Sequence, residues 1–238
     1  MIHGFTGTPW IFNDLKTTLN RRGILVSTPL LPGHGTQPSD LNRVRWQEWV
    51  ACGRNAYENL KRTCDSVFIL GLSMGGAISL YLAGDTNCAG VITLSAPVRF
   101  KKPWVYALPL IRLFLKTWRK RGVVPGSKDL EEQGYACYPL SALNQFVRML
   151  RQVRRKLKKI RCPALILHAK MDKKIPSANA EKIFRGIHSM QRRFRLLEHP
   201  CHVITKGEDR EIVEREVVQF ILEQLENKKP KTLIKSKK

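Results

Sequence analysis

The chain alternates between short apolar runs and longer stretches in which apolar positions recur at helical spacing. Runs rich in β-branched and aliphatic residues predict strands at 23–32, 66–73, 90–97, 164–172 and 193–199. The first four are nearly continuous, which is typical of strands buried on both faces of a parallel sheet. Between and around them, helices are predicted from about Pro9 to before Gly23, then at about 43–62, after Ser73, at about 177–188 and at about 208–227. This alternation predicts an α/β fold with crossover connections.

One stretch, residues 98–161, breaks the alternation and contains no predicted strand. In its second half, apolar residues recur at helical spacing at Leu143, Phe146, Val147, Leu150, Val153 and Leu157. Basic residues take the other faces of this predicted helix. We therefore expect a helical insertion at 98–161 in a core made of 1–97 and 162–227. The last segment, 228–238, is short and lysine-rich and is predicted to be disordered.

The formal net charge of +23 is unevenly distributed. Residues 99–161 hold 17 Lys and Arg against 3 Asp and Glu, and the tail 228–238 holds 6 Lys and no acid. Such a charge can attract anionic lipid, nucleic acid or acidic substrates, or can simply form a solvated surface. Nucleic-acid binding is not expected, because no strand interleaves aromatic and basic residues. Residues 104–118 are apolar with basic flanks, so they can touch an anionic membrane surface or line the roof of a pocket.

The length of 238 residues suits one domain with a sizeable core. No run of 18 uncharged apolar residues indicates a transmembrane helix, and no basic segment followed by an apolar one indicates a signal peptide. The 6 cysteines are scattered without a C-x-x-C pair. They predict free thiols in a reducing cytoplasm, with no metal site.

The stretch Gly71-Leu72-Ser73-Met74-Gly75 carries the most specific chemistry. It follows an apolar strand and precedes a predicted helix, which is the context of a nucleophile elbow. Small neighbours permit the tight turn that exposes a serine oxygen at the end of the strand. The helix N-terminus that follows favours developing negative charge there. Ser73 is therefore the candidate nucleophile.

A serine hydroxyl needs a base, and the base needs a carboxylate to orient it. In this kind of fold the chain order is serine, acid, histidine. Asp172 ends the apolar run "ALILHAKMD", and His202 follows the last predicted strand. His199 lies three residues before His202, and Glu198 is a competing acid, so both remain alternatives to the preferred pair.

An oxyanion formed during acyl transfer needs two backbone N–H donors. Met74, which follows the nucleophile, supplies one. The small-residue loop "HGFTGTPW" at 3–10 fits the second, with the N–H of Phe5 directed inward.

The sequence as a whole resembles the α/β-hydrolases, and in particular small bacterial carboxylesterases related to monoacylglycerol lipases. The resemblance covers about residues 1–225 and rests on "HGFTG" (3–7), "PLLPGHG" (29–35), "GLSMGG" (71–76), "SAP" (95–97), "MDKKIPSANA" (171–180) and "CHVIT" (201–205). It implies a mostly parallel sheet flanked by helices, with the insertion as a cap over an acyl pocket. It also implies Ser73 as nucleophile, His202 as base and then acid, Asp172 orienting His202, and the N–H groups of Phe5 and Met74 as the oxyanion hole. No cofactor is implied.

The resemblance further implies a serine carboxylesterase acting on short- to medium-chain acyl esters, with monoacylglycerols among the candidates. A lysophospholipase, thioesterase or acyltransferase with the same triad is an alternative, and so is a non-catalytic homologue. Two departures from the family matter. Cys201 stands where the family usually has glycine, so its Cβ can crowd the histidine loop or change its φ angle. Only Met1 and Ile2 precede His3, so we expect N-terminal strands that are missing or shortened.

Overall fold

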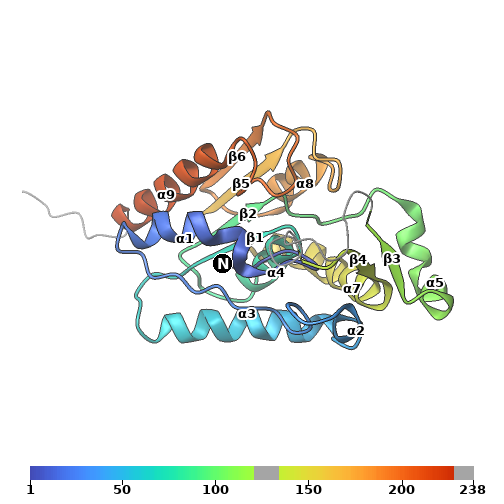
Figure 1. Cartoon of the computed structure of the whole chain (residues 1–238). Coiled ribbons are helices and arrows are strands. Elements are labelled where there is room, and N and C mark those ends of the chain that lie inside the picture. The colour runs from blue at the N-terminus through green and yellow to red at the C-terminus, as the bar shows by residue number, and fades with distance from the viewer. Residues whose placement is uncertain (121–133, 228–238) are drawn as a thin grey trace, which may run out of the picture.

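The computed structural model describes residues 1–120 and 134–227, which form a parallel sheet between two layers of helices (Figure 1). The sheet order is β1-β2-β5-β6, with each neighbouring pair parallel. Its strands are β1 Phe68–Leu72, β2 Gly90–Leu94, β5 Ala164–Ala169 and β6 Arg192–Leu197. All residues of β2 and β5 are buried, as their continuous apolar sequences require. The predictions of strands at 66–73, 90–97, 164–172 and 193–199 are confirmed.

The helices cover both faces of the sheet (Figure 1). One apolar cluster joins the sheet to α3 Trp46–Lys61, α4 Met74–Ala83, α7 Leu140–Lys156 and α8 Ala178–Gly186. A second cluster joins the opposite face to η1 Pro9–Phe12, α1 Asn13–Asn20 and α9 Arg210–Glu226. The predicted core helices are confirmed, with ends that move by a few residues. The core of the molecule therefore consists of two apolar layers with the sheet between them.

The predicted strand at 23–32 is wrong, because these residues form no strand in the structure. An extended segment becomes a strand when a neighbour completes its ladder of backbone hydrogen bonds. Within the described residues, the backbone beside this segment is Met1–His3, where the Met1 amine donates to the Ser27 carbonyl. Ile2 itself forms a single parallel bridge to Gly71 in β1. On the edge of β1 that faces away from β2, the described part of the sheet therefore ends in a single bridging residue, Ile2.

The insertion lies at one end of the sheet, away from α9 (Figure 1). It contains η2 Pro103–Ala107, α5 Leu108–Phe114, β3 Thr117–Arg119, β4 Cys137–Pro139, α7 and η3 Leu157–Lys159. The expectation that 98–161 holds no strand is wrong, because β3 and β4 pair antiparallel with Trp118 opposite Tyr138. Two three-residue strands leave little periodicity in a sequence, whereas the long amphipathic helix α7 was predicted. The tail 228–238 lies outside the described residues.

A short helix, α2 Pro38–Leu41, lies beside the insertion and completes the described elements. In the ranges 1–120 and 134–227, no helix is both long and apolar enough to span a bilayer. All six cysteines fall within these ranges, and all are free thiols.

Candidate active site

Ser73 sits on the turn between β1 and α4 with φ 54° and ψ −117°, a conformation that L-residues rarely adopt. The turn is possible because the neighbouring residues lack side chains. A Cβ on Gly75 would lie 1.9 Å from the Ile2 carbonyl oxygen, and one on Gly71 would lie 2.2 Å from the backbone of Gly75. The sequence G-x-S-x-G is therefore dictated here by close backbone approach around a strained serine.

Three polar side chains meet at the carboxyl ends of the parallel strands. Ser73 follows β1, Asp172 follows β5, and His202 follows β6. The His202 Nε2 lies 3.0 Å from the Ser73 Oγ, and the His202 Nδ1 lies 2.6 Å from the Asp172 Oδ2. With the ring proton on Nδ1, His202 donates to the carboxylate and accepts from the hydroxyl. The arrangement can remove a proton from Ser73.

The second oxygen of Asp172 is held by the loop that follows it. The backbone N–H groups of Lys174 and Ile175 donate to Oδ1 at 2.8 and 2.9 Å. Burial alone would raise the pKa of Asp172, but the hydrogen bond and charge of His202, with these two N–H groups, outweigh it and lower the pKa. The carboxylate is therefore ionised and fixed in orientation.

The other histidines of this region are placed differently. His199 contacts Asp209 through Nδ1 at 3.0 Å and Glu208 through Nε2 at 3.1 Å, and it contacts neither Ser73 nor Asp172. His168 donates from Nε2 to the Ile175 carbonyl at 2.9 Å. Burial lowers the pKa of His168, so it stays neutral beside Asp172. Of the histidines weighed from the sequence, His202 is the one that joins the serine to the acid.

The loop at 3–10 lies directly against the serine. A Cβ built on Gly4 would lie 3.4 Å from the Ser73 Cβ. Within the described residues, the backbone N–H groups of Phe5 and Met74 donate no hydrogen bond. Unpaired backbone N–H groups are rare in folded proteins. Two of them near a serine nucleophile can donate hydrogen bonds to an oxyanion.

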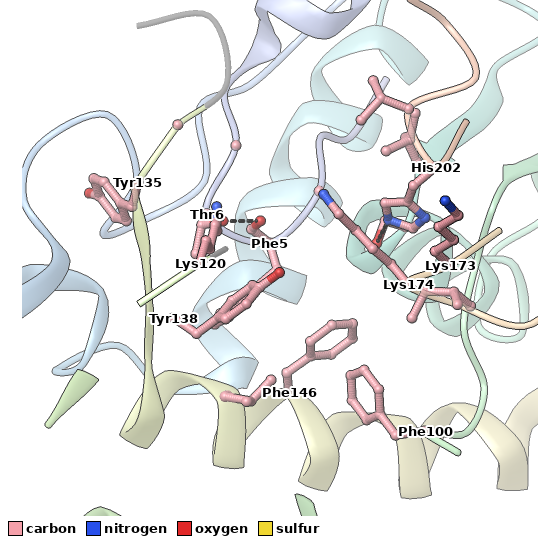
Figure 2. Close-up of a pocket in the computed structure, with 18 of the residues that line it drawn as sticks. Phe5, Thr6, Phe100, Lys120, Tyr135, Tyr138, Phe146, Lys173, Lys174 and His202 are labelled. Atoms are coloured by element: carbon pink, nitrogen blue, oxygen red, sulfur yellow. Dashed lines mark hydrogen bonds between the residues drawn. The ribbon is translucent and has the colours of Figure 1, made fainter. Parts of the chain in front are cut away.

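A cavity of about 830 Å³ opens above Ser73 and His202. Figure 2 shows Phe146 and Phe100 on one side of it and His202 on the other. The Phe5 ring centroid lies 5.6 Å from that of Phe146. Aromatic and aliphatic residues supply much of the lining, including Phe100, Trp104, Val105, Leu143 and Phe146. Across the described chain, no group of three or more His, Cys, Asp or Glu residues could hold a metal ion. The cavity is suited to an apolar chain attached to a reactive carbonyl.

Two residues of this cavity were not singled out from the sequence. Thr6 has φ 63°, and its hydroxyl donates to the Phe5 carbonyl at 2.6 Å. The ammonium group of Lys120, from the end of β3, donates to the Thr6 Oγ1 at 2.7 Å. The contact joins residues 114 positions apart, so no local pattern indicates it.

Cys201 is accommodated by another glycine of the histidine loop. Its φ is not positive, and a Cβ on Gly207 would lie 2.7 Å from the Cys201 Cβ and 2.9 Å from its Sγ. The absence of a side chain at Gly207 therefore makes room for the cysteine. The crowding expected from the sequence does not separate His202 from Ser73.

Comparisons with known proteins identify the family and the fold of the chain. A model of the family described as the alpha/beta hydrolase family matches residues 1–212. A thermostable monoacylglycerol lipase from Bacillus sp. (strain H-257) is 33% identical over 228 residues, covering 92% of this chain and 88% of the relative. A carboxylesterase from Bacillus subtilis (strain 168) is 27% identical over 223 residues, covering 93% of this chain and 90% of the relative. A solved structure described for the metagenome-derived lipolytic enzymes LipS and LipT superposes with a TM-score of 0.86 at 31% identity, over 93% of this chain and 91% of that one.

Proposed function

The chain belongs to the alpha/beta hydrolase family and is an ester hydrolase of the lipase and carboxylesterase type, and we propose that it cleaves esters of short- to medium-chain acyl groups, including monoacylglycerols, through an acyl-enzyme. The observation that supports this most directly is the hydrogen-bonded chain from Ser73 through His202 to Asp172 at an apolar cavity. Its geometry matches the roles of nucleophile, base and orienting acid.

In the proposed acylation, the Ser73 Oγ attacks the ester carbonyl while its proton moves to the His202 Nε2. The carbonyl oxygen becomes an oxyanion that accepts hydrogen bonds from the backbone N–H groups of Phe5 and Met74. Asp172 stabilises the imidazolium that forms. The tetrahedral intermediate then collapses, the bond to the alcohol oxygen breaks, and His202 returns its proton to that oxygen. The alcohol leaves, and the acyl group stays on Ser73.

In the proposed deacylation, a water molecule replaces the alcohol. His202 removes a proton from this water as its oxygen attacks the acyl carbonyl. The second tetrahedral intermediate collapses, the bond to the Ser73 Oγ breaks, and that oxygen regains its proton from His202. The products are a carboxylic acid and the original enzyme, so no cofactor enters the balance.

We assign residues 98–161 the role of a cap over the acyl chain. The support is that Phe100, Trp104 and Val105 line the cavity from one part of this segment, while Leu143 and Phe146 line it from α7. An acyl chain that removes apolar surface from water gains about 25 cal/mol per Å². The cap would therefore favour chains long enough to reach these residues.

The test is a series of p-nitrophenyl esters from acetyl to dodecanoyl. We expect kcat/KM to rise with chain length and then fall. Ser73→Ala should remove turnover, whereas Ser39→Ala, which changes an exposed serine of α2, should leave it intact. The same preparation assayed on an acyl thioester and a lysophospholipid separates the alternatives with the same triad. Turnover by Ser73→Ala, or none by the wild type on any of these, would contradict the proposal.

We also propose that α5 contacts an anionic membrane surface. The support is that its apolar residues Leu110, Leu113 and Phe114 are 68%, 69% and 86% exposed. Two cations, Arg112 and Lys116, lie among and beside them. Exposed apolar side chains flanked by basic ones are typical of segments that lie in a membrane interface. Val105 and Trp118, in contrast, line the cavity, so the roof-lining alternative holds for those residues.

Co-sedimentation with vesicles tests this contact. We expect binding that grows with the fraction of anionic lipid and that falls when Leu113→Ser and Phe114→Ser are combined. Leu25→Ser, at a residue 64% exposed elsewhere on the surface, is the control and should bind as the wild type does. Binding that ignores lipid charge, or that survives the double change, would refute the contact.

A further inference from the structure

The cavity that holds Ser73 is strongly cationic. Its described lining contains seven cationic side chains and no carboxylate, namely Lys101, Lys102, Arg119, Lys120, Lys173, Lys174 and Lys206. Within the described residues, Lys206 is the member of this set that forms an ion pair, with Asp14 at 2.8 Å. A neutral glycerol ester would leave the remaining charges without an anionic partner.

Two contacts hold the Lys120 side chain in place. Its ammonium group donates to the Thr6 Oγ1 at 2.7 Å and lies 5.2 Å from the centre of the Tyr138 ring. The side chain is partly buried, and its burial, together with the charge of Lys174, lowers its pKa to about 8. Thr6 directly follows Phe5, a proposed oxyanion donor. The ammonium group of Lys120 is therefore held against Thr6, the residue that follows the proposed oxyanion donor Phe5.

Lys174 faces Lys120 across the cavity. Its backbone is fixed, because its N–H donates to the Asp172 Oδ1 at 2.8 Å. Figure 2 shows its side chain extending across the cavity toward the side where Thr6 and Lys120 lie. Lys120 is partly buried and Lys174 is exposed, and their like charges repel each other. An anion between them relieves the repulsion. Hydrogen bonds between ammonium groups and phosphate or carboxylate are also stronger than neutral ones.

We propose that the preferred substrates are acyl esters whose alcohol part carries an anionic group, a phosphate or a carboxylate, bound between Lys120 and Lys174. This inference rests on the proposed esterase function and names its substrate class. The acyl chain lies among the apolar residues of the cap, and the anion lies on the opposite side of the ester bond. The lysines select the alcohol, while the apolar lining selects the acyl chain.

The experiment compares three octanoyl esters at concentrations below aggregation: octanoyl glycerol, octanoyl glycerol phosphate and octanoyl glycerate. We expect wild-type kcat/KM to be at least about tenfold higher for one or both anionic esters than for the neutral one, with a preference that shrinks in 0.5 M salt. The phosphate and carboxylate arms show which anion the site takes. An anionic-to-neutral ratio at or below one would overturn the inference while leaving the esterase function standing.

Variants locate the selectivity. Lys120→Gln and Lys174→Gln should each lower the anionic-to-neutral ratio by about tenfold, as expected for loss of one charge-assisted hydrogen bond. Lys182→Gln, an exposed lysine of α8 outside the cavity, should leave the ratio unchanged. Equal ratios in the wild type and both cavity variants would overturn the inference. If the wild type cleaves none of the three esters, the esterase function itself fails, and the two failures are thereby distinguished.

Discussion

Two buried histidines make the stability of this protein sensitive to acid. His3 and His34 lie side by side, with ring centroids 4.8 Å apart. Burial lowers the pKa of His3 to about 3, and His34 reinforces this shift. Burial also lowers the pKa of His34 to about 4, with a smaller contribution from Lys120, although hydrogen bonds to backbone carbonyls oppose it. Both rings are therefore mostly neutral in the folded protein at pH 5 and above.

The sign of the effect follows from proton binding. In the unfolded chain both histidines titrate near 6.5, so between that value and the folded pKa the unfolded state binds more protons. The free energy of unfolding then falls by about 1.4 kcal/mol per pH unit for each histidine. From pH 7 to pH 5 the loss is about 2 kcal/mol for each ring and about 4 kcal/mol for the pair. This loss is a large share of an ordinary folding stability.

Urea unfolding at pH 7 and pH 5 measures this loss. In His34→Asn, the difference between the two pH values should be about 2 kcal/mol smaller than in the wild type. His168, also buried with a lowered pKa, contributes to both proteins and cancels. His188→Gln, an exposed position, is the control and should keep the wild-type difference. An equal loss in the wild type and His34→Asn would show that the titration of His34 does not cause the loss.

Three further changes test particular contacts. Gly75→Ala should destabilise the fold by more than about 3 kcal/mol, measured by thermal unfolding, because its Cβ would lie 1.9 Å from the Ile2 carbonyl oxygen; a wild-type Tm would contradict this. Asp172→Asn should lower kcat on an acyl ester by roughly three to four orders of magnitude by favouring the wrong His202 tautomer, with stability as the control. Asn179→Ala should lower the free energy of unfolding by about 1–3 kcal/mol, because its buried Oδ1 accepts two backbone N–H groups at 3.0 and 2.9 Å; urea unfolding with no such loss would show that these groups find other partners.

The parts of the fold that the sequence predicts are those with a strong local pattern. The segment around β1 is continuously apolar and ends in Gly71-Leu72-Ser73, so both the strand and the turn were predicted. The carboxyl ends of parallel strands meet at one edge, which is why Asp172 and His202 could be expected near Ser73 without knowing any distance.

The errors arise where a structure depends on a distant partner. Residues 23–32 have the composition of a strand, but pairing requires a neighbouring strand, which a local pattern does not report. The strands β3 and β4 show the converse case. They are three residues long and are joined by pairs such as Trp118 with Tyr138, so the sequence around each one carries almost no periodic signal.

The cationic contacts of the cavity were missed for the same reason. Lys120 lies in a segment rich in basic residues, where one lysine resembles the next in the sequence. Its distinction is the contact with Thr6, which only the folded chain creates. The charge excess of the insertion could be counted from the sequence, whereas its concentration around the candidate nucleophile could not.

The role of Ser73 as nucleophile is tested most directly by covalent labelling of the folded protein with a fluorophosphonate, followed by mass spectrometry of the labelled peptide. Such a reagent reacts with a serine whose hydroxyl is activated by a neighbouring base. We expect one adduct, located on Ser73, which is lost in Ser73→Ala and strongly reduced when His202 is replaced by alanine. A folded wild-type protein that takes no label, or that is labelled equally after Ser73→Ala, would contradict the assignment of Ser73 as the nucleophile.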